Sequence, residues 1–99
     1  MSINYVPENI SGTITTGGTA QVLDPANDRR VGWFIQNNSA GSLWINDLGV
    51  AATLASPSIE IKTGTYMVAP FNTGYVSSAQ ISIIGATTGQ AFTAREWFI

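Results

Sequence analysis

The sequence predicts a single all-β domain: an antiparallel β-sandwich, a jelly-roll-like fold or a small barrel of about eight short strands. Segments rich in Ile, Val, Thr, Phe, Tyr and Trp alternate with a period of two and recur about every 8–12 residues. Ten glycines and four prolines punctuate them. A chain of 99 residues that is 44% hydrophobic suits one modest core. We therefore divide the chain into an extended arm, residues 1–9, and a β-sandwich domain, residues 10–99.

The first nine residues show no clear period and contain Pro7, which predicts an extended arm. One interpretation is a frayed terminus. The other is an arm that reaches onto a neighbouring molecule and contacts it through Ile3, Tyr5 and Val6.

Residues 10–15 alternate between apolar and polar positions and form the first predicted strand. Gly17 and Gly18 lie between Thr-rich flanks and predict a hairpin, because both accept the positive φ of primed turns. The return strand is residues 20–23, and the turn cluster 24–28 closes it.

Residues 31–35 form the strongest predicted strand. Large side chains on both of its faces indicate a central strand that is buried on both sides or sealed on one side by a partner subunit. A predicted hairpin loop, residues 37–41, leads to a return strand, residues 42–46. There Leu43 and Ile45 point inward and Trp44 points outward.

Residues 47–56 form either a short helical segment that ends before Pro57 or a long crossing loop, since Gly49 disfavours a helix. Pro70 is expected to end the strand before it. The remaining predicted strands are residues 58–62, 65–69, 80–84 and 90–97, with turns at Thr63-Gly64 and at residues 85–89.

The composition argues against catalysis. The chain has ten charged residues and neither histidine nor cysteine, so the usual proton shuttle, thiol nucleophile and soft metal ligands are missing. We expect no catalytic residues, no metal site and no cofactor. The carboxylates are interpreted as turn formers or solvated strand residues: Glu8, Asp24, Asp28, Asp47, Glu60 and Glu96.

Charge and hydropathy also argue against nucleic acid and membranes as partners. A net charge of −2 with four basic residues argues against nucleic-acid binding, which requires clustered Lys and Arg. No apolar run approaches the ~20 residues of a membrane helix. Residues 1–5 lack the basic and apolar regions of a signal peptide, so we expect neither membrane association nor export.

Two adjacent arginines, Arg29 and Arg30, precede the strongest strand and should point to opposite faces. In one interpretation Arg30 pairs within the fold with Asp28 or Glu96 and fixes the strand. In the other, one arginine bridges to a partner subunit.

Aromatic residues are the best interface candidates, because Trp and Tyr offer large, rigid and partly polar contact areas. Filling the core remains the simpler explanation for Trp33, Phe34 and Phe92. The candidate residues for an oligomer or coat interface are Tyr5, Arg29, Arg30, Trp44, Tyr66, Phe71, Tyr75, Trp97 and Phe98.

Three blocks of the sequence resemble a known group of proteins. The first is Arg29-Arg30 followed by residues 34–39 (FIQNNS). The second is LWIN at 43–46 with Gly49, AAT at 51–53 and SPSI at 56–59. The third is IIG at 83–85 running to GQAFTARE at 89–96. Together they resemble short virion-associated proteins of tailed bacteriophages, over residues 29–97.

The resemblance implies a capsid decoration or cement protein that binds the major capsid protein or another virion protein. It also implies a homo-oligomer, with a trimer favoured, assembled into the virion in the host cytoplasm. The alternative is a tail or fibre module that binds a carbohydrate or receptor, in which Trp44 or Tyr75 would stack on a sugar.

Overall fold

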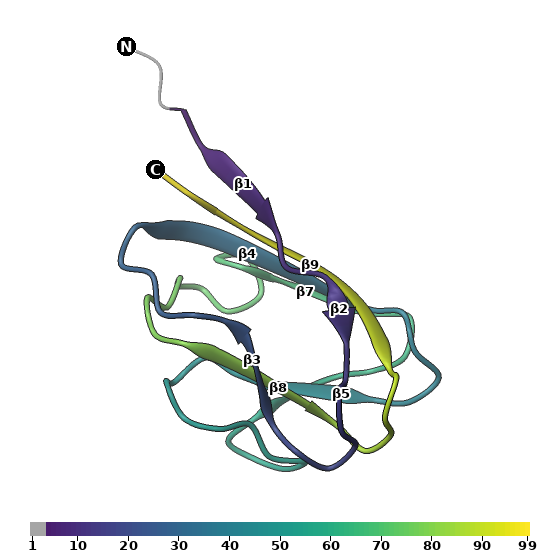
Figure 1. Ribbon diagram of the computed structural model, residues 1–99. Helices are drawn as coiled ribbons and strands as arrows, with labels where there is room; N and C mark the ends of the chain where they lie inside the picture. Colours follow the sequence, from purple (N-terminus) through teal and green to yellow (C-terminus); the bar gives the residue numbers. More distant parts are fainter. Residues whose placement is uncertain (1–3) are drawn as a thin grey trace.

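The chain forms a sandwich of two antiparallel sheets, as the sequence predicts (Figure 1). The computed structural model describes residues 4–99 and shows no helix among them. The strands of this part of the chain are β1 (Val6–Asn9), β2 (Gly12–Thr13), β3 (Gln21–Asp24), β4 (Arg30–Asn37), β5 (Leu43–Asn46), β6 (Ile59–Ile61), β7 (Tyr66–Ala69), β8 (Ile81–Gly85) and β9 (Ala91–Phe98).

The strand order is that of a jelly roll. Sheet A has the order β1-β9-β4-β7, with β2 following β1 along the same edge of β9, and sheet B has the order β3-β8-β5-β6. From β2 to β9, every connection crosses from one sheet to the other except that between β5 and β6. Strands that are neighbours in sequence therefore face each other across the core.

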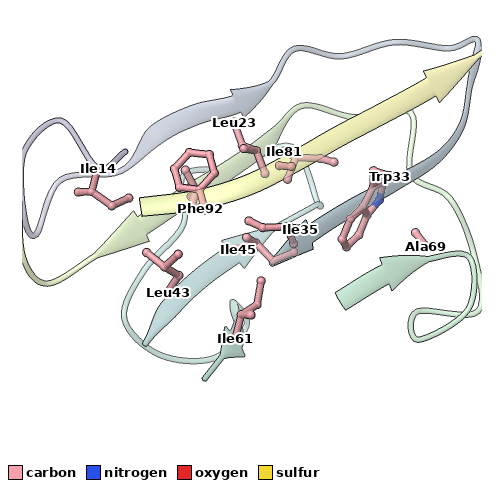
Figure 2. Close-up of a cluster of buried hydrophobic side chains, with 12 residues drawn as sticks. Ile14, Leu23, Trp33, Ile35, Leu43, Ile45, Ile61, Ala69, Ile81 and Phe92 are labelled. Carbon is pink, nitrogen blue, oxygen red and sulfur yellow. The ribbon is translucent and has the colours of Figure 1, made fainter. Parts of the chain in front are cut away.

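The core consists of the inward positions of both sheets. Figure 2 shows Ile35 and Trp33 of β4, Ile45 and Leu43 of β5 and other apolar side chains filling the space between the layers. Trp33 and Phe92 are buried, as predicted. The prediction is wrong for Phe34, which is only half-buried, because alternation along β4 turns it to the opposite face from Trp33 and Ile35.

Two predicted hairpins are wrong. Gly17-Gly18 does form a turn, in which the Thr19 N–H donates to the Thr16 carbonyl at 3.1 Å. However, β2 before it pairs with β9 in sheet A, whereas β3 after it pairs with β8 in sheet B. Loop 38–42 likewise joins β4 of sheet A to β5 of sheet B. Both segments are corners between the sheets, because the strand before each one pairs with β9 of sheet A and the strand after it pairs with β8 of sheet B.

Residues 47–58 form a long loop rather than the helical alternative, but the loop joins the paired strands β5 and β6 of sheet B and does not cross between the sheets. The Ala52 N–H donates to Ser82 Oγ at 2.9 Å, and Ala52 is buried. Ser82 and Ile84 lie on the outer face of β8, since Ile81 and Ile83 point into the core. Both are nevertheless buried, so the loop covers part of the outer face of sheet B.

The predicted N-terminal arm is extended at residues 6–9, where β1 runs along the end of β9 of the same chain (Figure 1). Its register pairs Val6 with Phe98 and Asn9 with Arg95, and all four residues of β1 are exposed. Ile3 lies outside the described residues.

Candidate interaction surface on the outer face of sheet A

The outer faces of the two sheets differ in whether a loop covers them. Sheet B has loop 47–58 folded over it, whereas the outer positions of sheet A form a surface on β4, β7 and β9. We call this surface the platform. Its members are half-buried or exposed, and they are Phe34, Tyr66, Val68, Arg95 and Trp97.

Strand register aligns these side chains in rows. Phe34 lies opposite Val68 of β7 on one side and opposite Arg95 of β9 on the other, so the three form one row across the sheet. Tyr66 lies in the next row and stacks on Phe34, with ring centroids 5.7 Å apart and planes inclined by 27°. An offset stack of this kind fixes both rings on the sheet face.

Trp97 occupies the adjoining row, opposite Gly32. A Cβ placed on Gly32 would lie 2.2 Å from two carbons of the indole, so the ring fills the space above the glycine backbone. A side chain at position 32 would therefore push the indole off the sheet.

Arg95 separates two shallow hollows on this side of the molecule. One, of about 320 Å³, is lined by Phe34, Val68, Arg95 and Trp97. The other, of about 350 Å³, is lined by Pro7, Glu8, Asn9 and Arg95. Arg95 is exposed, and within residues 4–99 its guanidinium group forms no ion pair. Arg95 thus offers a cation with apolar surface on the side of Phe34 and Trp97 and with polar residues on the side of β1.

Arg30 does not belong to any surface, which corrects its place among the interface candidates. Its side chain is fully buried, with Nη2 3.0 Å from Asp24 Oδ2 and Nε 3.5 Å from Glu96 Oε1. The predicted pairing with Glu96 is confirmed, but the second partner is Asp24 rather than Asp28.

Three backbone carbonyls complete the surroundings of the Arg30 guanidinium group. Nη1 donates to the carbonyls of Ser77 and Ala79 at 2.6 and 2.9 Å, and Nη2 donates to that of Pro25 at 2.6 Å. Arg30 therefore ties the start of β4 to the ends of β3 and β9 and to the β7–β8 loop.

The interpretation of the carboxylates as solvated or turn residues is wrong for Asp24, Asp47 and Glu96, which are buried. Burial raises the pKa of Asp24 to about 7, and the neighbouring Glu96 carboxyl group adds to the rise, while the charge of Arg30 opposes it. This carboxyl group lies beside Arg30 in the interior and not in a cleft.

Asp47 accepts a hydrogen bond from the hydroxyl group of Tyr75 at 3.1 Å. This bond raises the pKa of the Tyr75 phenol, and desolvation contributes further. The bond joins loop 47–58 to the β7–β8 loop.

The remaining predicted interface residues are distributed over other parts of the molecule. Trp44 is half-buried on the outer face of sheet B, beside Ile84 and Glu60. Phe71 and Tyr75 are exposed in the β7–β8 loop, and Tyr5 is exposed just before β1. The Arg29 guanidinium lies 5.9 Å from the ring centroid of Phe98, and Nε donates to the carbonyl of Ile99. Of the predicted set, only Tyr66 and Trp97 meet on the platform.

Sequence reasoning missed Phe34, Val68 and Arg95 as surface residues. The signal for Phe34 was present, because a strand with large residues at both Trp33 and Phe34 must turn one of them outward. Val68 and Arg95 carry no such signal, since their faces are set by the pairing of β7 and β9 with β4.

Comparison of the chain with protein-family models, curated proteins and solved structures finds no match. In residues 4–99, no helix has the length and apolar character needed to cross a membrane.

Proposed function

We propose that this chain is a non-enzymatic structural protein of a tailed-bacteriophage particle, a capsid decoration or cement protein that binds the coat lattice as a homo-oligomer. The resemblance of residues 29–97 to short virion-associated proteins supports the assignment to a particle. Fold analogy does not carry it, since β-sandwiches serve many functions.

The platform is the observation that supports a binding role. Trp, Tyr and Arg are the residue types that contribute most to protein interfaces, and Trp97, Tyr66 and Arg95 lie together on one sheet face. The proposed contact with the coat is this face, with Trp97 as its aromatic anchor and Arg95 facing a carboxylate of the coat.

The weak charge of the chain suits such a role. With only ten charged residues, little of the surface has a strong hydration shell to lose on contact. Each copy then needs only a modest affinity, because several copies joined in an oligomer bind a repeating lattice with avidity.

Co-sedimentation with undecorated capsids of the phage that encodes the chain tests this proposal. The matched variants are Trp97→Ala and Trp44→Ala, which remove half-buried tryptophans from the outer faces of opposite sheets. We expect the wild type and Trp44→Ala to pellet with capsids and raise their thermal tolerance, and Trp97→Ala to bind at least about tenfold more weakly. Wild-type protein that stays in the supernatant contradicts the proposal.

The same two variants test the tail or fibre alternative, which the position of Trp44 on an outer sheet face favours. A receptor-binding module should label host cells or bind glycans, and Trp44→Ala should abolish that binding. Tyr75 is a poorer candidate for the sugar contact, because its hydroxyl group is already bonded to Asp47.

A further inference from the structure

We propose that β7 is a docking edge to which a second copy of this chain adds its own β7 in antiparallel orientation, joining two copies of sheet A into one continuous sheet. This inference goes beyond the proposed function, which does not specify the contact between copies.

The free edges of the two sheets differ in how they are protected against pairing. Proteins block exposed edges with proline, charge, bulges or very short strands. β1 contains Pro7, β3 has a bulge between Val22 and Asp24, and β6 has three residues with Glu60 at its centre. In contrast, β7 has neither proline nor charge, and its register with β4 runs unbroken over four residue pairs.

Ladder geometry shows which backbone groups of β7 face outward. The Asn37 N–H donates to the Thr65 carbonyl at 2.9 Å, so Thr65 and every second residue after it direct their backbone groups toward β4. Tyr66 and Val68 therefore direct theirs toward the open edge. In the described part of the chain, no strand pairs with that edge.

Within residues 4–99, one outward backbone group of β7 already has a hydrogen bond, and the others are free to bond to an added strand. The Val68 carbonyl accepts a hydrogen bond from the Asn72 N–H at 2.9 Å and keeps a second lone pair. The N–H groups of Tyr66 and Val68 and the carbonyl of Tyr66 remain as donors and an acceptor for an added strand. An added strand would satisfy them without disturbing the pairing with β4.

A second copy fits this edge because the edge is self-complementary. With a two-fold axis at Met67, Tyr66 of each copy lies opposite Val68 of the other, and each pair exchanges N–H···O bonds in both directions. The chain has a net charge of −2, yet β7 itself is uncharged, so two copies meet there without like charges in contact.

Joining the sheets would also enlarge the platform. At ~4.8 Å spacing and ~3.3 Å per residue, β4 and β9 with eight residues each and β1 and β7 with four each present a face of about 380 Å² per copy. That is about half of the roughly 800 Å² per partner of a stable interface, which two joined faces of about 760 Å² approach. Tyr66 and Val68 lie beside the junction, so the two platforms would be continuous.

Sedimentation velocity of the purified chain over a range of concentrations tests the proposal. We expect a species of twice the 10.5 kDa chain mass that dissociates on dilution. Tyr66→Lys and Val68→Lys should each give monomers, because two lysines would lie close together across the axis. Val22→Lys is the matched control, since Val22 is an exposed valine on the outer face of edge strand β3.

A mixing experiment tests the register. Tyr66→Lys and Val68→Glu should each be monomeric alone, because each places two like charges near the axis. Their mixture should recover the dimer, because the introduced lysine of one copy then lies opposite the introduced glutamate of the other. Circular dichroism of each variant checks that the chain is folded. Tyr66 is 57% exposed, so its substitution leaves the core intact.

Several outcomes overturn the inference. These are a wild-type chain that stays monomeric at every concentration, a dimer that survives both lysine substitutions, and a mixture that fails to associate. A trimer insensitive to the β7 variants also overturns it, while leaving the proposed binding to the coat lattice intact.

Discussion

The indole of Trp97 takes the place that a side chain at position 32 would fill, so the position of this ring on the platform depends on Gly32, its partner in the pairing of β4 with β9. The glycine has ordinary strand geometry here, since its φ is not positive. Its role is to let a ring lie directly on the sheet.

Gly32→Ala should therefore displace Trp97. The added methyl group would lie 2.2 Å from the indole, and such overpacking destabilises a fold by about 1–3 kcal/mol. Thermal unfolding should show a lower Tm, and tryptophan emission should shift to longer wavelength as the indole enters water. In Gly12→Ala the new Cβ meets its nearest neighbour, Phe92, at an ordinary 3.5 Å, so this control should change the free energy of unfolding little.

The buried carboxyl group of Asp24 should make the stability of the fold depend on pH. Its pKa is about 7 in the fold against an ordinary value of 3.8, so the folded chain binds this proton more tightly than the unfolded chain does. This contribution is complete below about pH 4 and is lost as the pH rises through about 7. We expect a higher Tm at pH 5 than at pH 8.

Asp24→Asn provides the control for this pH effect, because asparagine resembles the protonated carboxyl group and does not titrate. Each 1 kcal/mol lost corresponds to about 4–8 °C in the Tm of a domain of this size. The difference in Tm between pH 5 and pH 8 should shrink in the variant. An unchanged difference would assign the pH dependence to other groups.

Arg30→Ala should be among the most destabilising substitutions in the chain. It removes a guanidinium group bonded to three carbonyls and leaves Asp24 and Glu96 buried without their cation. Breaking a buried ion pair in this way costs about 3–5 kcal/mol. Arg29→Ala is the matched control, because it removes the neighbouring arginine, which is exposed. Chemical denaturation should give this variant a free energy of unfolding within about 1 kcal/mol of the wild type.

Substitution of Asn37 should also destabilise the fold, because it too removes a buried hydrogen-bond donor. It is fully buried, and its amide nitrogen donates to the carbonyls of Gly41 and Ile61 at 2.8 Å, which ties the β4–β5 corner to β6. Asn37→Ala would leave the Ile61 carbonyl without this donor and cost about 1–3 kcal/mol, whereas the Gly41 carbonyl keeps the Ser39 hydroxyl group as a donor at 2.8 Å. Asn38→Ala, at the exposed neighbouring position, should unfold close to the wild-type midpoint. Equal midpoints for the two variants would contradict this assignment.

The sequence predicted the strands well because side-chain alternation is local. The pattern around Val31–Ile35 predicted β4, and Pro70 ends β7 as expected. Pairing is not local: nothing near Gly17-Gly18 reveals that β2 joins β9 while β3 joins β8. Glycine turns look alike whether they close a hairpin or form a corner between sheets.

The candidate site was harder to predict, because it too depends on which strands pair. Glu96 was one of two partners considered for Arg30, but Asp24 was interpreted as a turn former, and only the end of β3 brings it into the interior. Tyr66 was selected as an interface residue without its stacking partner, because Phe34 meets it only through the pairing of β4 with β7.

Imaging decorated particles at near-atomic resolution tests the central proposal most directly, because it shows which face of the sandwich lies against the shell. We predict that the platform faces the coat, with Trp97 and Arg95 in the contact. Density that places loop 47–58 and the outer face of sheet B against the shell, with the platform open to solvent, would contradict the account.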